Sequence, residues 1–253
     1  MLKPNQFKQI LDQIDSAYPS EQVDYKYIGT GNPDAKILIV GKETSIYADA
    51  HEQKEREIRN NLEDWKRIIS NNKFQVEKWN GSNYSPLYPY KGQQFKIDNR
   101  KNGGTSRTWY NYQKLYNLIY GKVDNPNIDF HKVVFITEVN SNPSLKTKEA
   151  DTSSIESRKK ILLKSEFIKS FPVVIISGLG YFEISENKNE IEEIFGVRFT
   201  RKESALNRKS QSYWIHEGVN PPKLLINTRQ LSIGVSDALL EAIAKEIRKS
   251  GLI

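Results

Sequence analysis

The sequence contains no cysteine, a single methionine and only three histidines among its 253 residues. The absence of cysteine excludes disulfide bonds, thiolate catalysis and zinc sites built on cysteine. The histidines are His51, His131 and His216, and no two of them have the His-x-x-x-His spacing of a metal-binding helix. We therefore expect neither a metal site nor a metal cofactor.

Long apolar runs are also absent. No stretch approaches the roughly 20 apolar residues of a membrane-spanning helix. The first residues, Met-Leu-Lys-Pro-Asn-Gln, lack the apolar core of a signal peptide. We expect a cytoplasmic protein without membrane contacts, and we treat it as a monomer.

Positive charge is in modest excess. The chain has 38 Lys and Arg residues against 31 Asp and Glu residues, which gives a formal net charge of +7 at pH 7. Such a surface attracts polyanions at neutral pH, which favours a nucleic acid as a partner. Because many basic proteins bind no nucleic acid, the charge alone does not identify the partner.

Four short apolar runs without helical spacing predict buried strands. They lie at 37–40, 132–138, 173–177 and 223–227, and amphipathic helical patterns separate them. Strands joined through helices are parallel, so we predict one α/β domain over 1–253, a three-layer α/β/α sandwich with a central, mainly parallel four-stranded sheet. The turn at 178–180, Gly-Leu-Gly, lacks the third glycine of a dinucleotide-binding fingerprint, so we expect no nucleotide cofactor.

Polar residues follow three of these strands. The first strand leads into Lys42 and Glu43, the second into 138–142, and the fourth into Arg229 and Gln230. Ligands of open parallel sheets bind beyond the carboxyl ends of the strands, so we expect these three exit loops to converge on one site. The alternative for Lys42 and Glu43 is a solvated pair of charges in a loop.

Residues 71–104 form a long excursion in which Asn, Gly and Pro interrupt every periodicity. Aromatic residues alternate there with cations, and the cations are Lys91, Lys96, Arg100 and Lys101. Aromatic faces that stack on bases, together with cations that bind phosphates, are the components of a nucleic-acid groove. The alternative is a loop whose aromatic side chains anchor it to the domain while its lysines stay in water.

A second basic tract lies in the insert at 186–218. One short helical pattern precedes it, and its cations include Arg201, Lys202, Arg208 and Lys209. The tract is either another surface that contacts phosphates or a solvated face.

In the order of these elements the chain resembles the uracil-DNA glycosylase superfamily. Its first strand leads into Gly41-Lys42-Glu43-Thr44-Ser45, where the family has motifs such as Gly-Gln-Asp-Pro-Tyr-His or Gly-Glu-Ala-Pro-Gly. The second strand is followed by an Asn, a polar loop and a Pro, and the third by a Gly. The fourth leads into 228–232, Thr-Arg-Gln-Leu-Ser, in place of the family's His-Pro-Ser-x-Leu. The match spans roughly 36–248 and depends on the order of four elements, because each motif alone is weak.

The resemblance implies a flipped nucleotide, a carboxylate that stabilises an oxocarbenium-like sugar, and donors that stabilise the leaving base. By position Glu43 is the catalytic carboxylate, and Arg229 replaces the histidine that serves the leaving base. The positions around the substrate are Gly41, Lys42, Ser45, Glu138, Asn140, Asn142 and Gln230. An ionised Glu138 only accepts hydrogen bonds, so it suits a base with an amino group better than uracil, and Asn140 is a second candidate for reading the base.

We therefore predict a divergent DNA glycosylase-like protein that acts on or binds a base in DNA and, if active, hydrolyses the N-glycosidic bond. One alternative is a catalytically inactive nucleic-acid-binding module on the same fold. The other is a hydrolase of nucleotides or small phosphorylated substrates, in which Lys42 and Arg229 hold the phosphate.

Overall fold

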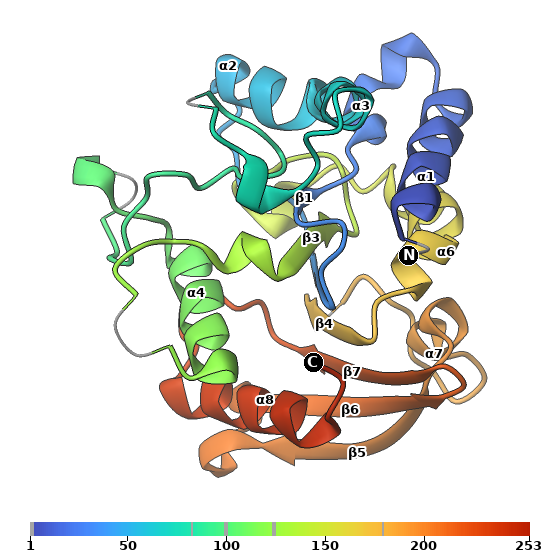
Figure 1. Cartoon of the computed structure of the whole chain (residues 1–253). Coiled ribbons are helices and arrows are strands. Elements are labelled where there is room, and N and C mark those ends of the chain that lie inside the picture. The colour runs from blue at the N-terminus through green and yellow to red at the C-terminus, as the bar shows by residue number, and fades with distance from the viewer. Residues whose placement is uncertain (1–2, 82, 99–100, 123–124, 179) are drawn as a thin grey trace.

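The computed structural model of the chain describes residues 3–81, 83–98, 101–122, 125–178 and 180–253. Within these residues a seven-stranded sheet forms the centre of the molecule (Figure 1). Its strands are β1 (Thr30–Gly31), β2 (Ile37–Gly41), β3 (Val134–Glu138), β4 (Val173–Ser177), β5 (Arg198–Ser204), β6 (Ser212–Val219) and β7 (Pro222–Thr228). They lie in the order β1-β3-β2-β4-β7-β6-β5.

The four predicted strands form the parallel centre of the sheet as β3-β2-β4-β7. The predicted α/β class is confirmed, whereas the predicted four-stranded sheet is wrong. β1 pairs antiparallel with β3 at one edge, and β6 and β5 continue antiparallel beyond β7 at the other. The insert at 186–218 therefore adds two strands. β5 escaped the sequence pattern because its residues, Arg-Phe-Thr-Arg-Lys-Glu-Ser, are polar almost throughout, as suits an edge strand.

Helices cover both faces of the sheet. In the described residues they are α1 (Lys3–Ala17), α2 (His51–Lys54), α3 (Asn61–Ser70), α4 (Arg107–Tyr120), α5 (Ile155–Arg158), α6 (Glu166–Lys169), α7 (Glu190–Phe195) and α8 (Asp237–Ser250). One face of the sheet, with Ile37 and Ile39 of β2, packs against α4 and α8, which lie side by side (Figure 1). The other face, with Leu38 and Val40, packs against α1, α3 and α6. Burial on both faces explains the unbroken apolar runs of the central strands.

Local signals in the sequence account for the ends of some helices but not for interruptions inside others. Ser106 caps α4 by accepting a hydrogen bond from the N–H of Trp109, and the helix ends at Gly121, whose φ is 65°. The helical pattern over 51–70 is divided between α2 and α3 by a π-helical turn at Glu55–Arg59. A second π-helical turn, at Lys159–Leu163, follows α5. Among the described residues, no helix combines the length and apolar character needed to cross a membrane.

Candidate functional site

The candidate site lies where β2 and β3 end side by side. Gly41 at the end of β2 is paired in register with Glu138 at the end of β3. The pairing continues beyond the strands, because the N–H of Asn140 donates to the carbonyl oxygen of Lys42 (2.7 Å). The two exit loops therefore run together and bring Lys42 and Glu43 next to Glu138.

The Glu43 carboxylate is held by two hydroxyl groups from neighbouring loops. Oγ1 of Thr147, in the loop after β3, donates to Glu43 Oε1 at 2.5 Å, and the hydroxyl of Tyr181, in the segment after β4, donates to Oε2 at 2.6 Å. Glu43 is only 7% exposed. The two donors orient the carboxylate and leave a second lone pair on each oxygen for a further donor.

The Glu138 side chain lies across Gly41. A Cβ atom on Gly41 would overlap Glu138 Oε2, so the path of this side chain requires a glycine. Oε2 is enclosed without a hydrogen-bond partner among the described residues, while the residue as a whole is partly exposed. Burial, and after it the charge of Glu43, raise the pKa of Glu138 to about 8 against the opposing charge of Arg158. Glu138 therefore carries a proton at neutral pH.

A buried arginine lies next to this pair of carboxyl groups. The guanidinium of Arg158 donates to the carbonyl oxygen of Glu138 through Nε (3.1 Å) and Nη2 (2.9 Å). It also donates to the carbonyl oxygen of Tyr27 (2.5 Å) and to Thr137 Oγ1 (3.2 Å). Burial lowers the pKa of Arg158 to about 10, so the guanidinium stays charged at neutral pH. Arg158 thus fixes the backbone at the end of β3 and places a positive charge near Glu138.

Arg158, Thr147 and Tyr181 were not predicted from the sequence. A signal for Arg158 was present, because it lies three residues after Ile155 and four before Leu162, on the apolar face of the helical pattern. A charge in that position indicates a buried polar partner. Thr147 and Tyr181 lie in loops without periodicity, so only the fold brings them to the site.

Asn140 and Asn142 hold the loop after β3. Asn140 Oδ1 accepts from the hydroxyl of Ser154 (2.7 Å), and its Nδ2 donates to the carbonyl oxygen of Asp151 (2.9 Å). Nδ2 of Asn142 donates to the same carbonyl oxygen (3.2 Å). Both asparagines are buried, and their amide groups are engaged within the loop.

Lys42 crosses from β2 toward β4. A Cβ atom on Gly178 would lie 2.7 Å from Lys42 Cγ, so this crossing also depends on a glycine. The Lys42 ammonium lies 5.5 Å from the centroid of the Tyr181 ring, and the residue is partly exposed. A cation therefore lies over the ring of Tyr181, the residue whose hydroxyl group donates to Glu43. Ser45 is exposed in the loop after β2, and Gln230 is partly exposed in the loop after β7.

Arg229 is engaged away from Glu43. β4 lies between β2 and β7, so the ends of those two strands are about 10 Å apart across the sheet. The Arg229 guanidinium donates to the carbonyl oxygens of Ile233 (3.0 Å), Gly234 (3.1 Å) and Ser210 (3.2 Å). Arg229 thus ties the loop after β7 to the connection between β5 and β6.

The aromatic side chains of the 71–104 excursion pack against the domain. The ring pairs and their centroid distances are Tyr88 with His131 (3.6 Å), Tyr90 with Trp109 (3.9 Å) and Phe95 with Tyr110 (4.4 Å). This packing corresponds to the alternative in which aromatic residues anchor the loop. Lys91 and Lys96 are exposed, whereas Arg100 and the side chain of Lys101 lie outside the described residues.

In the second basic tract, Arg201 is paired with carboxylates, whereas Arg208 and Lys209 are exposed. The carboxylates that surround Arg201 are Glu246 (2.7 Å), Glu203 (3.3 Å) and Glu217 (3.7 Å). Lys202 lies over the Trp214 ring, with 5.3 Å between its Nζ and the ring centroid. Arg208 and Lys209 are exposed in the connection between β5 and β6. Because β6 runs antiparallel to β7, the start of β6 lies beside the end of β7. The connection between β5 and β6 therefore lies at the same end of the sheet as the carboxyl ends of β2 and β7.

No family model and no curated protein matches the chain. Across the described ranges, no group of three or more His, Asp or Glu side chains is arranged to bind a metal ion. The site's own chemistry is that of two adjacent carboxyl groups, Glu43 and Glu138, in unlike surroundings. Such a pair can divide the roles of acid and base, with the protonated Glu138 as the proton donor.

Proposed function

We propose that this protein is a divergent DNA glycosylase that hydrolyses the N-glycosidic bond of a base in DNA. The observation that carries the proposal is the pair of carboxyl groups at the ends of β2 and β3. Glu138 has an enclosed carboxyl oxygen and a pKa that burial raises to about 8, which favours its protonated form at neutral pH, and Glu43 is oriented by two hydroxyl donors. The proposal also draws on the resemblance of the motif after the first strand to the uracil-DNA glycosylase superfamily, which implies that Glu43 acts at the sugar.

The two carboxyl groups divide the reaction between them. As the bond between C1′ and the base nitrogen breaks, its electron pair leaves with the base and positive charge develops on the sugar. Glu43 stabilises that charge and takes a proton from the water that adds to C1′. Glu138 gives its proton to the leaving base, which therefore departs without a negative charge.

The protonation state of Glu138 also determines which bases the site prefers. An ionised carboxylate only accepts hydrogen bonds and would favour an amino group on the base. The protonated Glu138 presents a donor, which suits a carbonyl oxygen or an unprotonated ring nitrogen. We therefore propose a base with such an acceptor in place of the amino-bearing base expected from the sequence.

The cation of the proposed site is Lys42. Its ammonium lies over the ring of Tyr181, whose hydroxyl group donates to Glu43, and the residue is partly exposed. Arg229, the cation expected from the sequence, uses its donors on three carbonyl oxygens of neighbouring loops. We assign to Lys42 the phosphate next to the flipped nucleotide, a contact that a compact ammonium makes well.

The test uses duplex oligonucleotides that carry uracil or another modified base, followed by alkali, which cleaves the strand at abasic sites. The wild-type protein should release product from at least one duplex. Glu43→Gln keeps the size of the side chain but removes the charge, so it should lower the rate by roughly a hundredfold or more while retaining DNA binding. Glu149→Gln, at an exposed glutamate in the loop after β3, is the matched control and should keep the wild-type rate. Intact duplexes throughout, or a fully active Glu43→Gln variant, would overturn the proposal.

A second candidate, a hydrolase of nucleotides or small phosphorylated substrates, is favoured by the packing of the 71–104 loop. Tyr88 and Phe95 stack on rings of the domain and Tyr90 packs at a tilt against Trp109, so these three side chains anchor the loop to the domain instead of extending from it toward a strand of bases. Free nucleotides therefore belong in the same screen, and turnover of these alone would identify the second candidate. DNA binding without product from either substrate class would instead indicate an inactive binding module.

A further inference from the structure

The segment after β4 brings Tyr181 to Glu43, and a glycine directly precedes the tyrosine. Gly178 follows the strand, and Gly180 directly precedes Tyr181 with a φ of 105°. Glycine adopts such a conformation without strain, and it has no side chain whose packing would fix the position of the tyrosine that follows. The position of the Tyr181 hydroxyl therefore depends on how the residues after it are held.

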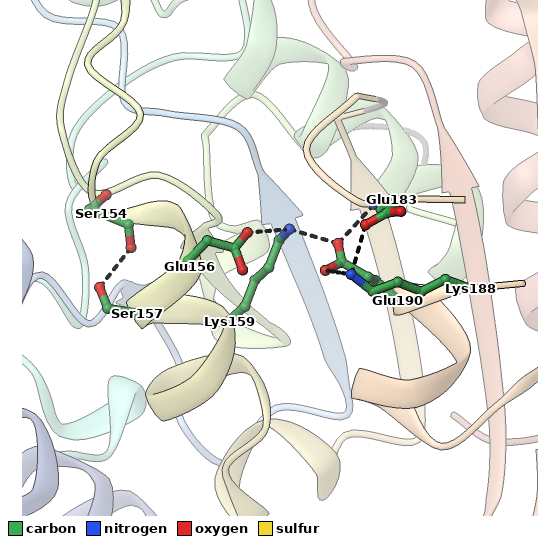
Figure 2. Close-up of polar contacts among 7 residues, drawn as sticks. All are labelled: Ser154, Glu156, Ser157, Lys159, Glu183, Lys188 and Glu190. Carbon is green, nitrogen blue, oxygen red and sulfur yellow. Dashed lines mark hydrogen bonds and ion pairs between the residues drawn. The ribbon is translucent and has the colours of Figure 1, made fainter. Parts of the chain in front are cut away.

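A buried ion pair holds those residues. Nζ of Lys159 lies 2.6 Å from Glu190 Oε2, and the same oxygen accepts from the N–H of Glu183 at 2.8 Å. Nζ of Lys159 also lies 5.7 Å from the centroid of the Phe182 ring. Figure 2 shows Lys159 reaching toward Glu190, which lies against Glu183. Both residues that follow the tyrosine are thus held by Lys159, one through its ring and the other through Glu190.

The helical segment that carries Lys159 also contacts the strand that carries Glu138. Lys159 directly follows Arg158, whose guanidinium donates to the carbonyl oxygen of Glu138. The start of the same helical segment is tied to the loop after β3, because the Ser154 hydroxyl donates to Asn140 Oδ1. Adjacent residues of one helical segment therefore hold the backbone of Glu138 and the segment that carries the partner of Glu43.

We propose that Lys159 and Glu190 are positioning residues that hold the Tyr181 hydroxyl against Glu43 and thereby fix the orientation of that carboxylate. The inference rests on the proposed function for the role of Glu43 in hydrolysis, but the contact itself can be tested alone. Stability is a weaker explanation of the pair, because the cost of burying two charges offsets most of their attraction. The bond from Glu190 to the backbone of Glu183 instead places a loop.

The ionisation of Tyr181 reports the contact. Burial, and next the hydrogen bond to Glu43, raise the pKa of Tyr181 above the ordinary tyrosine value; the charge of Glu138 adds to this effect and a hydrogen bond with Asn140 opposes it. The Lys42 ammonium also lies over the ring. In NMR with tyrosine isotope-labelled at Cζ, the wild-type Tyr181 signal, assigned with Tyr181→Phe, should not titrate up to about pH 11, one unit above the ordinary value of about 10.

Removal of the ion pair should release the tyrosine. In the double variant Lys159→Met with Glu190→Met, the Tyr181 signal should titrate with a midpoint near the ordinary value of about 10. Replacing both partners leaves no unpaired buried charge, which favours retention of the fold. Glu190→Gln, which is nearly isosteric, provides a second variant and should shift the midpoint in the same direction.

The matched control uses the other carboxylate that contacts Lys159. Glu156 lies 3.0 Å from the same Nζ but is exposed, so Glu156→Gln should leave the Tyr181 titration unchanged. A Tyr181 signal that behaves as in the wild type in both the double variant and Glu190→Gln would overturn the proposal. An equal shift in Glu156→Gln would do so as well.

Catalysis provides a separate measurement on a duplex from which the wild type releases a base. Tyr181→Phe and the Lys159/Glu190 double variant should each lower kcat by roughly 10- to 100-fold. Their combination should be no slower than Tyr181→Phe, because the ion pair acts through the tyrosine. If the fold-losses in kcat of Tyr181→Phe and of the double variant multiplied in the combined variant, the inference would be contradicted. If the wild type releases a base from no duplex, the NMR titration still tests the positioning role of Lys159 and Glu190. Failure of the proposed function is therefore distinguishable from failure of this inference.

Discussion

The carboxyl group of Glu138 occupies the space that a side chain on Gly41 would fill. The two residues are register partners in the parallel pair of β2 and β3, so the contact is built into the sheet itself. It keeps Glu138 Oε2 out of water, and this burial is the main cause of the raised pKa of Glu138. The proton donor of the proposed reaction therefore depends on the absence of a single methyl group on the neighbouring strand.

Gly41→Ala tests this dependence. The backbone of Gly41 lies outside the left-handed region, so alanine is compatible with the strand, but its methyl group would displace the Glu138 carboxyl toward water. We expect the pKa of Glu138 to fall toward its ordinary value of 4.5. The rate of base release at pH 7 should drop by roughly 10- to 100-fold as the proton donor is lost. A variant with the wild-type pH–rate profile would show that the Glu138 carboxyl stays in place.

The raised pKa of Glu138 predicts that stability falls as the pH rises. Between 4.5 and about 8 the unfolded chain has released this proton while the folded protein retains it. The Glu138 contribution to the free energy of unfolding therefore decreases by up to about 1.4 kcal/mol per pH unit and levels off above about pH 8. In Glu138→Gln this contribution is absent. The free energies of unfolding measured with urea at about pH 5 and about pH 8 should therefore differ less in this variant than in the wild type. Equal differences in the two proteins would contradict the assignment of the proton.

Arg158 should be intolerant of lysine. Its guanidinium supplies separate donors to the carbonyl oxygens of Glu138 and Tyr27 and to Thr137 Oγ1, and the single nitrogen of lysine does not reproduce that fork. Because buried acceptors would lose their partners, Arg158→Lys should lower the free energy of unfolding by about 2 kcal/mol or more. Arg67→Lys, at a side chain that is 68% exposed, is the matched control and should change it by less than about 0.5 kcal/mol. Similar losses in both variants would count against this account of Arg158.

The central strands were predictable because burial on both faces leaves a local signature. The runs that became β2, β3, β4 and β7 have buried apolar residues on both faces of the sheet, and Ser106 and Gly121 mark the ends of α4. β5 was missed because an edge strand buries little apolar surface, and the residues of β5 are mostly polar. The interruptions by π-helical turns also carry no local sequence signal.

The candidate site was predictable only as far as the strand ends. Lys42, Glu43 and Glu138 follow from the rule that ligands bind beyond the carboxyl ends of parallel strands. Arg229 was expected beside Glu43, but the order of strands in space is not the order in the chain, and β4 lies between β2 and β7. Tyr181 is brought to Glu43 by contacts far apart in the sequence, which no local pattern records.

The two parts of the second basic tract should behave differently toward DNA. Arg201 lies within ion-pair distance of three carboxylates, so Arg201→Ala should leave the affinity for a duplex nearly unchanged, contrary to the expectation from sequence. Arg208 and Lys209 are exposed at the sheet edge that carries the candidate site, so their replacement by alanine should weaken binding. Fluorescence anisotropy at several salt concentrations should then show the slope of log affinity against log salt reduced by roughly one for each lost phosphate contact. Equal weakening by Arg201→Ala would mean that its carboxylate partners release it to the DNA, and no effect of the double replacement would place the DNA on another surface.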